Sequence, residues 1–85
     1  MSTYKINKGF ITQKIGDKIT IFDGEESQLI TFNETATYIF ERIKRKIDDE
    51  KIIELLLKRY KIEEKRARED FEDLILKLKK LKIIK

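Results

Sequence analysis

The spacing of apolar residues changes at Asn33, and this change restricts the folds that the chain can adopt. Before Asn33 the apolar residues form short runs separated by turn residues, a pattern typical of β-strands. After it they recur every three or four residues, as in amphipathic helices. Asn33 itself is a good helix N-cap, and Glu34 adds a carboxylate at the positive end of the helix dipole. The pattern therefore predicts a sheet followed by helices.

Three strands are expected in the first part of the chain, and they are Phe10–Ile15, Lys18–Phe22 and Ser27–Phe32. The pairs Gly16-Asp17 and Asp23-Gly24 are turn signals that separate these runs closely enough for hairpins. Together the strands predict a three-stranded antiparallel meander. Such a sheet needs a layer of helices to be stable.

The rest of the chain predicts three helices. The first follows Asn33, and its apolar face consists of Ala36, Ile39, Phe40, Ile43 and Ile47. Asp48 is expected to cap the second helix, which carries an unusually wide apolar surface, with Ile47 and Ile52 packed across the cap. The third begins near Glu63, and its apolar face consists of Ala67, Phe71, Leu74, Leu78 and Leu81, with Ile75 to one side.

The final residues Ile83 and Ile84 are expected to pack back onto the domain. Three strands and three helices in this order predict an α+β fold of the winged helix-turn-helix type. With 85 residues, the chain has room for one domain, spanning residues 1–85.

The composition argues against catalysis. The chain has no cysteine and no histidine, which excludes disulfides, the usual zinc ligand sets and imidazole acid–base chemistry. Its many carboxylates are explained as helix caps and as ion pairs one turn apart, such as Glu64 with Arg68. We therefore expect no catalytic residue, no metal and no cofactor. No apolar run approaches the roughly 20 residues that cross a bilayer, so we expect a cytoplasmic protein without a membrane partner.

The third expected strand, 27–32, is unusual because Leu29, Ile30 and Phe32 give it apolar side chains on both faces. Two interpretations remain open. The domain's own helices can cover both faces. Alternatively, the strand lies at the sheet edge and accepts an extended peptide as a fourth strand, in a groove beside the third helix.

Two other kinds of partner are compatible with the sequence. A net charge of +4 and the lysine-rich stretches 44–46 and 77–82 are features of a winged-helix nucleic-acid-binding regulator. The N-terminal half of the third helix is acidic, however, and phosphate would repel it, so nucleic-acid binding is disfavoured. The wide apolar second helix could instead contact a partner enzyme. A homodimer formed by exchange of strands also remains open.

Several segments, taken in order, resemble one known family. They are Ile21-Phe22-Asp23-Gly24, Leu29 to Ala36 with its Phe32-Asn33-x-Thr35-Ala36 core, Tyr60-Lys61-Ile62, and Ala67-x-x-Asp70-Phe71-x-x-Leu74. Over residues 10–84 the chain resembles PqqD-like proteins, the RiPP recognition elements of ribosomal peptide biosynthesis. The resemblance implies a non-catalytic module that binds the leader segment of a precursor peptide. The resemblance further implies that this module presents the leader to a modifying enzyme or leader peptidase, in a lasso-peptide or radical-SAM pathway.

In that family the leader adds as a strand beside the third strand and rests against the third helix. Carried onto this sequence, the resemblance implies a leader-peptide site formed by Gln28, Leu29, Ile30, Thr31, Arg68, Asp70, Phe71, Ile75 and Leu78. Leu29 and Ile75 are expected to lie off the core faces and are the strongest candidates. Phe71 and Leu78 can belong either to the core or to the site. Asn33 is interpreted as a cap.

Overall fold

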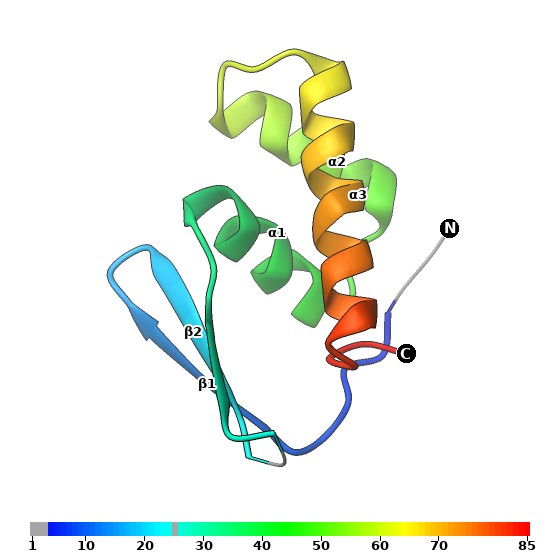
Figure 1. Ribbon diagram of the computed structural model, residues 1–85. Helices are drawn as coiled ribbons and strands as arrows, with labels where there is room; N and C mark the ends of the chain where they lie inside the picture. The colour runs from blue at the N-terminus through cyan, green and yellow to red at the C-terminus, as the bar shows by residue number, and fades with distance from the viewer. Residues whose placement is uncertain (1–3, 25) are drawn as a thin grey trace.

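The computed structural model describes residues 4–24 and 26–85. It contains strands β1 (Phe10–Ile15), β2 (Lys18–Asp23) and β3 (Gln28–Thr31), then helices α1 (Glu34–Lys44), α2 (Asp49–Arg59) and α3 (Glu64–Lys80). In Figure 1 the helices lie on one side of the sheet, and Lys14 of the β1–β2 hairpin forms an ion pair with Glu41 of α1 at 3.1 Å. The predicted α+β fold, a three-stranded antiparallel sheet followed by three helices, is confirmed.

The sheet has the order β1-β2-β3, with both pairs antiparallel. Successive side chains alternate between its two faces. The face toward the helices, here called the inner face, carries the buried side chains of Ile19, Ile21 and Ile30. The opposite, outer face carries Phe22 and Leu29, which are paired with each other in the register. Only the inner face therefore contributes to the hydrophobic core.

The third strand is shorter than predicted. It starts at Gln28 because Ser27 has a backbone φ of 49°, in the left-handed region, where a strand cannot begin. It ends at Thr31, although the N–H of Phe32 still donates to the carbonyl of Ile19 at 2.9 Å. Of the predicted turn before it, Gly24 lies in a turn, and the next residue is outside the described ranges.

Helix α1 joins the sheet to the other helices. The Asn33 side chain accepts a hydrogen bond from the N–H of Ala36 at 2.8 Å, which confirms the predicted cap. The buried Thr37 hydroxyl accepts a hydrogen bond from the N–H of Ile19 at 2.9 Å and thereby fixes α1 on β2. The buried face of α1 consists of Thr37, Ile39, Phe40 and Ile43.

Helices α2 and α3 pack against each other, and both contact α1. Asp48 occupies the N-cap position of α2, but its side chain makes no capping hydrogen bond, so only the position of that cap was predicted correctly. Ile52, Ile53 and Leu56 of α2 are buried, and most of its wide apolar surface is thus used inside the domain. Among the described residues, no helix is both long and apolar enough to cross a membrane.

The two ends of the described chain are tied together. Ile83 and Ile84 are buried, as predicted. Ile84 forms an isolated bridge with Ile6, and the N–H of Asn7 donates to the carbonyl of Ile83 at 2.8 Å. The C-terminal end of α3 is therefore held next to the segment that leads into β1.

Candidate functional site

Strand β3 has a free edge, because β2 is its only neighbour in the described sheet. Phe32 directs its N–H toward β2, and main-chain groups alternate along a strand. The N–H and C=O groups of Leu29 and Thr31 therefore point to the free edge. The hydroxyls of Thr20 and Thr31 lie 3.3 Å apart, as expected for a pair without main-chain hydrogen bonds. The edge thus offers two donors and two acceptors to a further strand.

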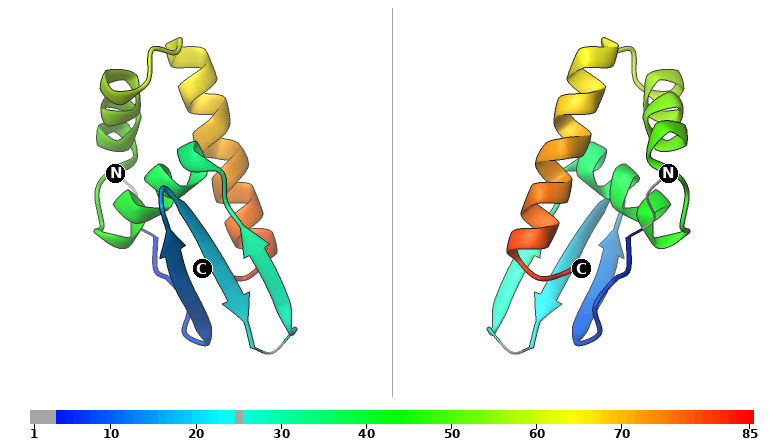
Figure 2. Two further views of the ribbon diagram at one scale, coloured as in Figure 1. Left: turned by 90° about the vertical axis from the view of Figure 1, so that its left-hand side faces the viewer. Right: turned by 90° about the vertical axis from the view of Figure 1, so that its right-hand side faces the viewer.

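A groove of about 360 Å³ lies between this edge and α3. Its lining residues come from the end of β3, the start of α1 and the middle of α3: Thr31, Phe32, Asn33, Thr35, Ala36, Ile39, Asp70, Asp73, Leu74 and Lys77. Phe32, Ile39 and Leu74 are almost fully buried and form an apolar floor, whereas Asp73 and Lys77 are exposed. Both views in Figure 2 place the C-terminal part of α3 beside β3.

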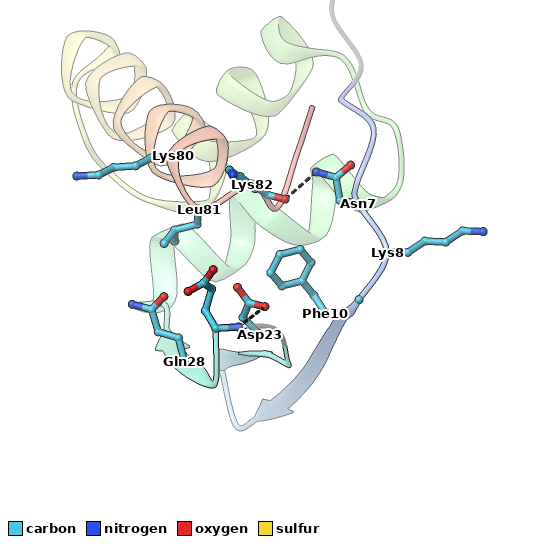
Figure 3. Close-up of a pocket in the computed structure, with 10 residues that line it drawn as sticks. Asn7, Lys8, Phe10, Asp23, Gln28, Lys80, Leu81 and Lys82 are labelled. Atoms are coloured by element: carbon cyan, nitrogen blue, oxygen red, sulfur yellow. Dashed lines mark hydrogen bonds between the residues drawn. The ribbon is translucent and has the colours of Figure 1, made fainter.

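A second hollow, of about 420 Å³, lies at the start of β3. Figure 3 shows Phe10, Leu81 and Asp23 around it, while Lys8 and Lys80 extend away on opposite sides. Gln28 also lines it, and the Nδ2 of Asn7 donates to the carbonyl of Lys82 at 2.7 Å. Since Gln28 borders this hollow and Thr31 borders the groove, the two spaces flank β3 at its two ends.

Comparison with known proteins supplies a family for this arrangement. The family described as coenzyme PQQ synthesis protein D (PqqD) matches residues 19–84, which include all of β2 except its first residue, β3 and all three helices. The chain belongs to the PqqD family. No curated protein gives a significant match to this PqqD-family chain.

Two solved structures are similar to this PqqD-family chain. One is TbiB1 in complex with the TbiA(beta) leader peptide, with 14% identity and a TM-score of 0.86 over 95% of this chain and 94% of that chain. The other is a lasso peptide synthetase B1 complexed with the leader peptide, with 18% identity and a TM-score of 0.86 over 98% and 96% of the two chains. At such identities the likeness concerns the fold, and it agrees with the predicted fold class.

Some predicted site residues of the PqqD-family chain border the two spaces beside β3. Thr31 and Asp70 line the groove, and Gln28 lines the second hollow. The Oδ1 of Asp70 accepts a hydrogen bond from Arg66 Nε at 3.3 Å, one helical turn away. Ile30 faces inward and is buried.

Leu29 lies off the core, as expected, but the implication that it lines the groove against α3 is wrong. Its side chain lies on the outer face and is 68% exposed, because the register pairs it with Phe22 while its neighbour Ile30 pairs with the buried Ile21. Strand alternation allows only one of Leu29 and Ile30 to face the helices, and Ile30 takes that place. Leu29 therefore does not line the groove.

The expectation that Ile75 lies off the core is also wrong, because its side chain is only 7% exposed. It borders a cleft that is also lined by Tyr4 and Ile53, so the N-terminal segment and α2 cover this side of α3. Phe71 and Leu78, left open between core and site, are core residues. The apolar face of α3 is thus wider than the stripe read from the sequence, because α3 is covered on two sides.

Arg68 lies on the α2 side of α3, away from β3. Its guanidinium donates to both carboxylate oxygens of Glu50 on α2, at 2.9 and 3.0 Å, and its Nε donates to Glu64 at 3.0 Å. These hydrogen bonds lower the pKa of Glu50 and raise the pKa of Arg68. Arg68 is therefore engaged in linking two helices and does not border the groove.

Sequence reasoning missed groove residues at the start of α1 and others on one face of α3. Asp73 and Lys77 follow Asp70 at intervals of one and two helical turns, and Lys80 continues the same row into the second hollow. Asp70 was identified from the family motif. Counting helical turns along α3 from Asp70 could therefore have found Asp73, Lys77 and Lys80.

Tyr4 anchors the N-terminal segment against α2. Its hydroxyl donates to Oδ2 of Asp49 at 3.1 Å. Burial, and then the hydrogen bond and charge of Asp49, raise the pKa of Tyr4 to about 12. Burial also raises the pKa of Asp49, although the hydrogen bond from Tyr4 opposes this shift. The pair borders the cleft on the α2 side of α3.

Proposed function

We infer that this PqqD-family chain binds the leader segment of a ribosomally synthesised precursor peptide, which adds as a fourth strand at the free edge of β3. The observation that carries this proposal is the unpaired edge of β3 beside a groove against α3. Family membership and the two similar structures, both of proteins holding leader peptides, support it. The bound leader is then presented to a modifying enzyme or leader peptidase.

Main-chain hydrogen bonds supply part of the affinity. Leu29 and Thr31 together offer two N–H and two C=O groups, and each hydrogen bond is worth about 0.5–1.5 kcal/mol net. A leader residue opposite Ile30 directs its side chain to the inner side, toward the apolar floor around Leu74. Backbone pairing therefore gives affinity, and the groove gives selectivity for an apolar side chain.

The proposed role is non-catalytic. The chain has neither thiol nor imidazole, and the described residues include no group of three or more metal-ligating side chains placed to hold an ion. A lasso-peptide pathway is the favoured setting, because one of the similar structures is a lasso peptide synthetase B1; a radical-SAM pathway is the other.

The proposal is tested by searching the neighbouring genes for a short precursor peptide and synthesising its leader segment with a fluorescent label. Binding is followed by fluorescence polarisation for the wild type and for Thr31→Pro, which removes an N–H from the free edge and places a proline ring against the incoming strand. We expect affinity to fall by about tenfold or more, since a hydrogen bond is lost and the ring blocks close approach.

Thr12→Pro is the matched control. The register makes Ile11 and Gln13 the residues of β1 that bond to β2, so the N–H of Thr12 points to the other free edge of the sheet. The Thr12→Pro variant should therefore bind the leader with the same affinity as the wild type. Unchanged affinity in Thr31→Pro, with a native circular dichroism spectrum, would rule out strand addition at β3.

A salt titration separates this function from nucleic-acid binding, the alternative suggested by the lysines at the end of α3. Binding that engages many phosphates weakens by roughly 10³–10⁵ between 50 and 200 mM salt. Strand addition should change far less. The carboxylates of Asp70 and Asp73 beside the groove would repel a phosphate backbone and already disfavour the alternative.

A further inference from the structure

The outer face of the sheet carries an apolar row that the groove does not use. Ile11, Phe22 and Leu29 lie directly opposite one another across the three strands. Their side chains are 67%, 38% and 68% exposed. In a chain with 42% charged residues, strand alternation gives this face a single charged residue, Lys18 at the hairpin tip. A contiguous exposed apolar row of this kind is a candidate interaction surface.

The geometry of strand addition places a ligand side chain beside this row. Leu29 directs its main-chain groups to the free edge, so one residue of an added antiparallel strand exchanges both hydrogen bonds with it. Directly opposed residues have their side chains on the same face, with Cβ atoms about 5 Å apart. The ligand residue opposite Leu29 therefore lies on the outer face, and the preceding ligand residue, opposite Ile30, faces α3.

We propose that Leu29 is a specificity-determining residue that selects an aliphatic or aromatic side chain on the outer face of the bound peptide strand. This proposal rests on the proposed function. The outward-facing residues of β3 are Leu29 and Thr31, and neither carries a charge. An apolar ligand side chain extends the row from Phe22 and Leu29 to a fourth strand. The recognised segment thus carries an apolar residue immediately after the one that enters the groove.

The experiment compares Leu29→Thr with Ile11→Thr. The side chains of Leu29 and Ile11 belong to the same row and have nearly the same exposure, but only Leu29 adjoins the added strand. We expect Leu29→Thr to weaken binding of the labelled synthetic leader by about two- to fivefold, the size of a cross-strand pair. Ile11→Thr should leave affinity unchanged.

An alanine scan of the same leader on both proteins identifies the partner residue. At one apolar leader position, alanine should weaken binding to the wild type but should cause no further loss of affinity for Leu29→Thr. A leader with aspartate at that position should bind the wild type more weakly than the leader with alanine. Equal affinity of Leu29→Thr and Ile11→Thr would overturn the proposal, as would tolerance of aspartate at every outward position. If Thr31→Pro weakens binding while Leu29→Thr does not, this inference fails and strand addition stands. If neither does, strand addition itself fails.

Discussion

At the scale of single residues, neighbouring positions in this chain serve separate purposes. In the stretch from Leu29 to Asn33, Leu29 and Thr31 direct main-chain groups to the free edge, Ile30 and Phe32 fill the core, and Asn33 caps α1. A strand with period-two alternation makes this division possible within five residues. Binding and folding can therefore be tested separately by point substitutions.

The caps of α1 and α2 give the first test. Asn33→Ala should lower the free energy of unfolding by about 1 kcal/mol, because the side chain accepts the N–H of Ala36. Asp48→Ala should cost clearly less, since Asp48 makes no capping hydrogen bond and its Oδ1 is buried without a hydrogen-bond partner among the described residues. Urea unfolding measures both. A larger loss in Asp48→Ala would contradict the assignment of these caps.

The pair of Tyr4 and Asp49 predicts a pH dependence of stability. Burial raises the pKa of Tyr4 from 10.0 to about 12, so the folded state favours the neutral phenol. This contribution is complete below pH 10 and is lost as the pH rises from 10 to 12. Over that range the free energy of unfolding of the wild type should fall more steeply than that of Tyr4→Phe. Parallel pH profiles from urea unfolding would show that Tyr4 does not titrate as described.

At the scale of the elements, α3 has three differently used sides. One faces the core, one borders the groove beside β3, and one is covered by α2 and Tyr4. The amphipathic stripe predicted the first side correctly. It could not predict the third, because an apolar residue at the margin of a stripe is covered or exposed according to which other element packs there. Ile75 is covered by α2 and the N-terminal segment. The sequence of α3 alone does not indicate that either element packs there.

Ile75 and Leu76 test that description of α3. Ile75→Glu should destabilise the domain by several kcal/mol or prevent folding, because it buries an unpaired charge. Leu76→Glu, at the next position with 66% exposure, should change the free energy of unfolding by about 0.5 kcal/mol or less. Thermal unfolding monitored by circular dichroism distinguishes them. A stable Ile75→Glu variant would mean that this side of α3 is open.

At the scale of the whole molecule, the order of the elements followed from the sequence, whereas the lining of the candidate site followed only in part. Three local signals each correspond to an observed boundary of a strand or helix. They are the change in spacing of the apolar residues at Asn33, the turn at Gly16 and the Asn33 cap. The face on which Leu29 lies depends on the register with β2, which is a long-range property. Thr31 and Asp70 border the groove, but Leu29 and Ile75 do not, because sheet register and helix covering decided their positions.

The arrangement of the sheet makes the central claim directly testable, because the sheet, within the described residues 4–24 and 26–85, has two free edges and only the β3 edge has α3 beside it. The decisive measurement is the affinity of the labelled leader for Thr31→Pro and Thr12→Pro under identical conditions, with both proteins shown to be folded. Strand addition at β3 predicts a loss of about tenfold or more for Thr31→Pro and wild-type affinity for Thr12→Pro. Equal affinities for the two variants would contradict it.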